Sequence, residues 1–221
     1  MNDDVLRIRR RQAVDTVKRE LIRSAAKKLF AKSGLDGTSV REIARLAGYT
    51  TGAIYFHYAN KEELYADILR DSLDRLLVSV SAAVSAKDSP VEALSGAFHA
   101  FVRFYDENPR DFDLGLYLLS GIQPRGLTPA LNFELNTRLL AVLDLYRVHL
   151  ARAGINKGRL NVEVAGLFDE MIGSLVAAHT GRLRVIGTNL SEVVDHHVAN
   201  LVFRLTQGHN RPQRRGASAS K

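Results

Sequence analysis

The chain has 221 residues, of which 46% are hydrophobic, so it is long enough for one or two domains with a substantial apolar core. It contains no cysteine, which excludes disulfides and thiolate metal sites and favours a reducing, cytoplasmic compartment. The formal net charge is +7, and residues 1–63 hold 13 Lys and Arg against 8 Asp and Glu, so a polyanion is expected to bind the N-terminal part.

The N-terminus and the apolar segments give no sign of export or membrane insertion. The opening stretch, MNDDVLRIRRR, has acids first and no apolar run behind its arginines, so we do not interpret it as a secretory signal. The longest weakly polar run, residues 76–86, is shorter than the roughly 20 residues of a membrane span. We therefore expect a soluble cytoplasmic protein with no membrane partner.

Few strand-like alternations and only five prolines favour an all-α fold. Residues 11–33 read as one amphipathic helix, whose expected buried stripe is Val14, Val17, Leu21, Ala25 and Leu29. Breaks rich in Pro, Gly, Asn and Asp divide the rest of the chain. The longer helices expected between these breaks cover residues 60–86, 90–107, 109–120, 128–152, 160–186 and 190–207.

Residues 38–64, TSVREIARLAGYTTGAIYFHYANKEEL, contain three helix starts close together. Ser39, followed three residues later by a glutamate, is typical of a capping box, and Gly48 is placed to end that helix. Thr50 can cap a second short helix, and Asn60 can cap a third, longer one. The pattern predicts tight corners between short helices.

A two-turn helix, a glycine corner and a second short helix are what a helix-turn-helix unit requires, with the second helix in the major groove of DNA. The apolar positions expected to face the first helix are Val40, Ile43, Ala44, Ala47, Ile54 and Tyr58. Hydroxyl groups and ring edges suit phosphate oxygens and base edges, and small residues let the backbone approach DNA closely. The residues expected to face outward are Thr50, Thr51, Gly52, Ala53, Tyr55 and His57.

A series of positions in register over residues 38–64 resembles the DNA-binding signature of the tetracycline-repressor (TetR) family. They are Thr38, Val40, Ile43, Ala44, Ala47, Gly48, Thr50, Gly52, Ile54, Tyr55, Tyr58, Lys61, Glu62 and Leu64. The resemblance covers residues 11–75 and implies a DNA-binding domain over residues 11–60. Tyr49 and Thr51 depart from the family's usual residues, which leaves the operator sequence open.

The resemblance also implies roles for individual residues of this domain. Thr50, Tyr55, His57 and Lys61 are expected to hold phosphates, and Thr51, Ala53 and Arg41 to face bases or the adjoining backbone. Structural alternatives stay open, because Tyr55 could pack in the interior and His57 could be an ordinary surface histidine. Arg7, Arg9, Arg10 and Arg11 could form an arm against the minor groove, or a solvated tail.

Residues 61–207 are expected to form a larger helical domain for ligand binding and dimerisation, followed by a disordered basic tail over residues 208–221. The resemblance to the family implies that this domain is a dimeric ligand sensor, in which two helices of each chain form a four-helix bundle. Packing of the same residues within one chain is the alternative. The predicted dimer residues are Gly166, Gly173, Ala177, Gly181, Val194, Val198, Leu201 and Leu205.

A ligand pocket is expected to be mostly apolar with a few polar groups, so the inducer is expected to be a hydrophobic or aromatic small molecule. Aromatic residues at helical spacing can equally be plain core. The candidate ligand-binding residues are Phe98, His99, Phe101, Tyr105, Tyr117, Phe133, Asn136, Phe168, Ile172, Leu175 and His179. His179 is expected on an inward apolar stripe with Phe168, Ile172 and Leu175.

Catalysis finds little support, because none of the nucleophile, nucleotide or metalloprotease motifs occurs. Glu192, Asp195 and His196 could grip a metal, but solvated charge is the simpler interpretation, so no metal or cofactor is expected. The sequence therefore predicts a homodimeric repressor that leaves a near-palindromic DNA operator when an unidentified inducer binds. The alternatives are a ligand-independent activator or architectural DNA-binding protein, and a helical enzyme or carrier with a vestigial helix-turn-helix.

Overall fold

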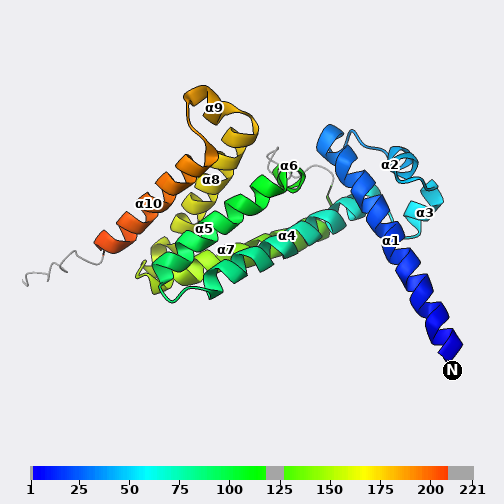
Figure 1. The fold of residues 1–221 in the computed structure, drawn as a ribbon, viewed down its shortest axis with the longest axis horizontal. Helices are drawn as coiled ribbons and strands as arrows, with labels where there is room; N and C mark the ends of the chain where they lie inside the picture. Colours follow the sequence, from blue (N-terminus) through cyan, green and yellow to red (C-terminus); the bar gives the residue numbers. More distant parts are fainter. Residues whose placement is uncertain (1, 118–126, 209–221) are drawn as a thin grey trace, which may run out of the picture. The chain divides into compact units, whose positions relative to one another are not determined.

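The computed structural model describes residues 2–117 and 127–208, which contain helices and no strand (Figure 1). The helices are α1 Asn2–Ser33, α2 Val40–Ala47, α3 Thr51–Tyr55, α4 Lys61–Ser85, α5 Pro90–Glu107, α6 Pro109–Tyr117, α7 Pro129–Arg152, a 3-10 turn Lys157–Arg159, α8 Leu160–His179, α9 Arg182–Ile186 and α10 Leu190–Gly208. The predicted all-α fold is confirmed. The predicted tail lies outside the described residues from position 209 onward.

Two helix boundaries differ from the prediction. The first helix begins at Asn2, nine residues before the predicted start at 11. The expected helix over 160–186 is two helices, because Gly181 adopts a left-handed backbone with φ of 73° between α8 and α9. Glycine takes this conformation without the steric cost that a Cβ atom would add.

The buried face of α1 agrees with the predicted one only in the second half of the helix. Val14 and Val17 are 66% and 60% exposed, and Leu21 is exposed as well, whereas Ala25 is buried as predicted and Leu29 is half-buried. The residues that α1 buries are Ile22, Ala25, Ala26 and Phe30. The helical spacing of apolar residues was therefore a sound indication of helix, but it did not identify the face that meets the core.

The chain divides into two compact units, each built from two segments. The first unit contains Met1–Leu76 and Tyr105–Leu140, and the second contains Leu77–Phe104 and Ala141–Lys221. Helices α4, α5 and α7 each run from one unit into the other. This division by packing does not follow the predicted functional boundary between residues 60 and 61, which stays a prediction.

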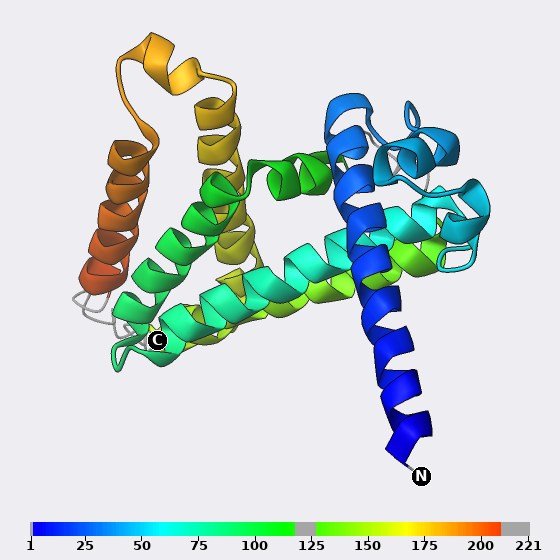
Figure 2. The ribbon, with the colours of Figure 1, turned by 45° about the vertical axis from the view of Figure 1, so that its right-hand side comes forward.

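The core of the first unit joins α1, α4 and α6 (Figure 2). The rings of Phe30 and Tyr65 meet edge to face, with centroids 5.2 Å apart. The Tyr65 hydroxyl donates a hydrogen bond to the carbonyl of Leu114 in α6. Buried aromatic rings therefore connect the first helix to the two helices that pack across it.

The core of the second unit joins α5, α7, α8 and α10. The hydroxyl of the buried Tyr146 in α7 donates to the Ala97 carbonyl of α5 at 2.8 Å, and burial raises the pKa of this phenol. Phe101 and Phe168 meet edge to face with centroids 6.2 Å apart, which joins α5 to α8.

Among the described residues, none of the helices is long and apolar enough to cross a membrane.

Candidate nucleic-acid interface

Local side-chain chemistry builds the corner around α2 as predicted. The Ser39 hydroxyl accepts from the Glu42 backbone N–H at 3.3 Å, and the Glu42 carboxylate accepts from the Ser39 N–H at 2.9 Å. The Ser39 hydroxyl also donates to the Glu42 carboxylate at 2.7 Å, and this bond, together with that from the Ser39 N–H, lowers the pKa of Glu42. Gly48 ends the helix with φ of 74°. The predicted capping box and glycine terminator are confirmed, and together they turn the chain towards α3.

Helix α3 is capped as predicted but is shorter than expected. The Thr50 hydroxyl accepts a hydrogen bond from the Ala53 N–H at 3.3 Å. The helix ends at Tyr55, so Phe56 and His57 lie in the turn that follows it. The acceptor role of Thr50 leaves its hydroxyl hydrogen able to point at a phosphate oxygen.

The outward face of this unit agrees with the prediction at four positions. Ile43, Ala44 and Ile54 are buried against the rest of the unit. Thr51 and Ala53 are half-buried, whereas the exposed positions are Arg41, Thr50, Gly52 and Tyr55, the last 54% exposed. Contacts of these residues with DNA stay a prediction, with their exposure as support.

His57 does not point outward as the sequence suggested. Its ring is half-buried beside Phe56 and Tyr58, and its Nε2 atom is enclosed without a hydrogen-bond partner among the described residues. Burial lowers the pKa of His57, and the nearby Lys18 ammonium lowers it further. A neutral, enclosed imidazole is poorly suited to hold a phosphate. The position of His57 differs from the expected one because His57 lies beyond the end of the short helix.

Lys61 has a structural role that the sequence did not suggest. Its ammonium donates to the carbonyls of Leu35 at 2.8 Å and Thr38 at 3.1 Å, in the segment between α1 and α2. Two of its three N–H donors therefore hold this segment against the start of α4. The predicted phosphate contact can use only the third donor.

The sequence interpretation missed two aromatic residues on the surface of the unit. Phe56 is 73% exposed next to Tyr55, and the Lys18 ammonium of α1 lies 5.4 Å from the centroid of the Tyr49 ring. Tyr49 directly precedes the cap Thr50. The adjacent tyrosine and phenylalanine in GAIYFH were the available signal, because a five-residue helix cannot bury both rings.

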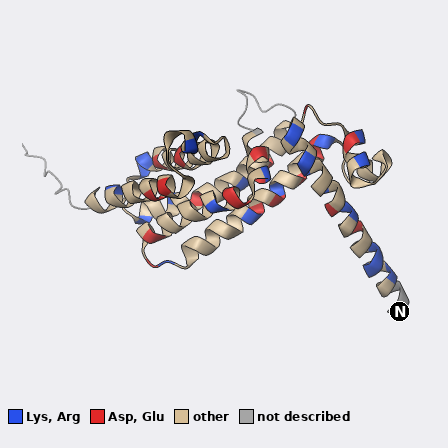
Figure 3. Cartoon of the chain, turned by 45° about the horizontal axis from the view of Figure 1, so that its top comes forward, with Lys and Arg blue, Asp and Glu red and all other residues tan. Residues whose placement is uncertain are grey.

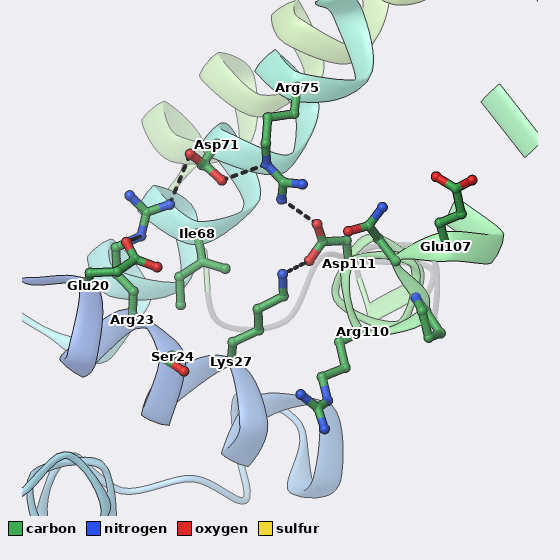
Figure 4. A pocket seen from close by; sticks show the side chains of 12 residues that line it. Glu20, Arg23, Ser24, Lys27, Ile68, Asp71, Arg75, Glu107, Arg110 and Asp111 are labelled. Atoms are coloured by element: carbon green, nitrogen blue, oxygen red, sulfur yellow. Dashed lines mark hydrogen bonds and ion pairs between the residues drawn. The ribbon is translucent and has the colours of Figure 1, made fainter. Parts of the chain in front are cut away.

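Five charged residues form a chain of alternating ion pairs between α1, α4 and α6 (Figure 4). Asp111 is fully buried and pairs with Lys27 of α1 and Arg75 of α4, the latter at 2.5 Å. Arg75 also bonds Asp71 at 3.0 Å, and Asp71 pairs with Arg23 at 3.3 Å. A cavity of about 580 Å³ lies beside these ion pairs. Nothing in the sequence pattern indicated a buried Asp111.

The candidate ligand-binding residues are divided between the two units, and their role stays a prediction. Tyr117 ends α6, and its side chain lies outside the described part. Phe168 and Ile172 are half-buried. The fully enclosed candidates, which form core, are Phe98, Phe101, Tyr105 and Leu175. The exposed candidates are His99, Phe133, Asn136 and His179, so the inward position expected for His179 is not found in the single chain.

The exposed candidates have identifiable surroundings. The His99 ring contacts the Ser95 carbonyl at 2.8 Å and Asp195 at 3.2 Å. His179 ends α8 and borders a hollow of about 530 Å³ with Thr180, Gly181, Arg184 and Val185. The stripe that includes Leu175 points inward. His179 is the last residue of α8, and two residues later Gly181 adopts a left-handed backbone that changes the chain direction before α9.

Three of the eight predicted dimer residues belong to the interior of the chain. Val194, Leu201 and Leu205 of α10 are buried, and α10 packs against α8. Packing within the chain accounts for these three residues, whereas a dimer contact through the other face of α10 stays a prediction. Ala177, Gly181 and Val198 are half-buried, while the exposed members of the predicted stripe are Gly166 and Gly173. Val162 and Phe203, which the sequence interpretation missed, are exposed as well.

Replacing Gly173 with arginine should separate a dimer that uses the exposed face of α8. No atom lies within 4 Å of a Cβ built at Gly173, so the single chain accommodates the side chain. At an interface the same arginine buries an unpaired charge, which we expect to weaken dimerisation at least about tenfold. Sedimentation analysis measures this, with Ala130→Arg on α7 as the control. A folded Gly173→Arg protein that dimerises normally removes Gly173 from the interface.

Comparison with known proteins places the DNA-binding unit in a described family. Residues 22–68 match the family model "Bacterial regulatory proteins, tetR family". The transcriptional repressor KstR2 of Mycolicibacterium smegmatis is 41% identical over 81 residues, 37% of this chain and 39% of KstR2. The transcriptional repressor AcnR of Corynebacterium efficiens is 28% identical over 184 residues, 80% of this chain and 88% of AcnR.

Similarity in three dimensions extends over most of the chain. The structure of AibR in complex with isovaleryl coenzyme A and operator DNA superimposes with a TM-score of 0.68 and 19% identity, covering 84% of this chain and 98% of that chain. The match to KstR2, by contrast, spans about two fifths of its length. These relatives are transcriptional regulators, not enzymes. The family model and the repressor relatives agree on the N-terminal part: residues 22–68 match the DNA-binding domain of the tetR family of bacterial regulatory proteins.

Proposed function

We propose that this protein is a dimeric transcriptional repressor that binds a near-palindromic operator through α2 and α3. The observation that carries the proposal is the capped corner at Gly48, which presents Arg41, Thr50 and Tyr55 on the exposed side of a family-matched DNA-binding unit. The relatives KstR2 and AcnR are repressors, which supports repression rather than activation. Operator binding by AibR supports the DNA partner.

The second part of the proposal is release from the operator by a small, hydrophobic or aromatic inducer. Support comes from AibR, whose structure contains isovaleryl coenzyme A, a ligand with an apolar acyl group. A ligand can release DNA only if it binds the DNA-free conformation more tightly than the DNA-bound one. The charged cavity beside Asp111 does not fit such an acyl group, because ion pairs and polar groups line most of it.

Selection from a pool of random duplexes tests the DNA-binding proposal. The protein should enrich sequences with two related half-sites whose centres lie about 34 to 36 Å apart, or a small multiple of one helical turn. Tyr55→Phe should weaken binding to the selected operator and to an unrelated duplex by the same factor, because a phosphate contact carries no sequence information. Thr51→Ala should change the preference among operator variants.

Thr137→Ala is the matched control, because Thr137 is an exposed threonine of α7 outside residues 22–68, the part that matches the family model. It should leave affinity and preference unchanged. A pool that yields no common sequence would contradict the proposed function. If Thr51→Ala binds every duplex as the unmodified protein does, the base-facing role of Thr51 is wrong.

A further inference from the structure

The first half of α1 is a helix whose side chains are mostly open to solvent. Residues 5–20 are exposed apart from Asp15 and Lys18, which are half-buried. Within the first unit, this part of α1 extends past α2 and α3 (Figure 1). The segment that the sequence suggested as an arm is therefore a helical rod. The body of a helix about 10 Å wide does not fit a minor groove of about 6 Å, so the backbone phosphates are the nearer targets for its basic side chains.

The basic residues of this rod are not equivalent. At about 100° per residue, Arg7, Arg11 and Lys18 fall along one side, whereas Arg9 falls on the opposite side. The row of blue positions on the free part of α1 is visible in Figure 3. We call Arg7, Arg11 and Lys18 the basic stripe.

The basic stripe is continuous with the surface of the helix-turn-helix unit. The Lys18 ammonium lies over the ring of Tyr49, which immediately precedes the cap of α3. The stripe therefore starts beside the corner between α2 and α3 and continues from there along α1 towards the N-terminus. From Lys18 to Arg7 it covers eleven residues, or about 16 Å at 1.5 Å per residue, which matches the spacing of several phosphates on a duplex.

We propose that the basic stripe binds backbone phosphates of the DNA that flanks each operator half-site. The inference rests on the proposed function, and it adds a second, sequence-independent contact surface beside α2 and α3. Charge complementarity selects DNA as the occupant, because three cations lie on one side of the rod and continue the surface that the proposed function assigns to DNA. The exposed Val14 lies on the same side of the rod as the stripe and Val17 lies next to it, so these two residues are the competing surface for a second copy.

The experiment compares Arg11→Gln with Arg9→Gln, which removes the same charge from the opposite side of the same helix. Each variant is titrated with the selected operator on a duplex with about ten flanking base pairs, and on one that ends at the half-sites. We expect Arg11→Gln to bind the flanked duplex several-fold more weakly and to reduce its salt slope by about 0.9, the value for one lost phosphate contact. Arg9→Gln should match the unmodified protein on both duplexes.

Equal losses for Arg9→Gln and Arg11→Gln would overturn the proposal, since they would show only the effect of net charge. It would also be overturned if Arg11→Gln had no effect while Val17→Asp changed the oligomeric state, which would assign the rod to a second copy. Failure of the proposed function looks different, because then the unmodified protein selects no operator. If an operator is selected and Tyr55→Phe weakens it, but flanking DNA does not matter, only the basic stripe is wrong.

Discussion

Replacing Lys27 and Arg75 together by methionine should destabilise the protein by about 3 to 5 kcal/mol. Both cations pair with Asp111, whose side chain has no exposed surface. Their removal leaves a buried carboxylate without compensation, and this is the costly way to break a buried ion pair. Urea unfolding followed by circular dichroism measures the loss, and amide exchange in α6 reports whether it begins at Asp111.

Two further variants separate burial from a general loss of charge. Arg159→Met with Arg204→Met removes two cations from Glu163, but both arginines are mostly exposed, so the loss should be much smaller. Adding Asp111→Asn to the Lys27 and Arg75 double variant removes the stranded charge and should recover part of the stability. If the triple variant is no more stable than the double one, an uncompensated Asp111 is not the cause.

Operator affinity should fall by about three to five orders of magnitude between about 50 and 200 mM salt. Six to ten neutralised phosphates produce a change of this size. Residues 1–63 carry 13 Lys and Arg against 8 Asp and Glu, and α3, TGAIY, contains no charged residue. Phosphate neutralisation is therefore expected to supply most of the affinity, with α3 adding shorter contacts to the bases.

Fluorescence anisotropy with the selected operator measures this dependence. An unrelated duplex of the same length should bind more weakly but with a similar slope, because it offers the same phosphates. A flat profile for the operator would mean that uncharged contacts dominate, and it would contradict the role given to the basic N-terminal part.

The parts of the interface that the sequence predicted correctly are those decided by neighbours along the chain. Ser39 and Glu42 are three residues apart, so their reciprocal caps need no other part of the molecule. Gly48 ends α2 for an equally local reason, its tolerance of a left-handed backbone. Such features follow from residue type and spacing, and the three helix starts in this region were predictable for that reason.

Features decided by distant parts of the chain were not predictable in the same way. Val14 and Val194 both lie on apolar helical stripes, but Val14 is exposed while Val194 is buried. Spacing identifies a stripe without saying which element covers it. The same limit applies to Asp111, because its partners Lys27 and Arg75 are 84 and 36 residues away in sequence.

The bonds of Lys61 tie the beginning of α4 to the segment before α2 at two points, the carbonyls of Leu35 and Thr38. The stem of a lysine is flexible, so small movements of α4 can be taken up by its side-chain rotations without loss of these bonds. A displacement of α4 larger than the stem can follow would either break both bonds or carry the segment before α2 with it.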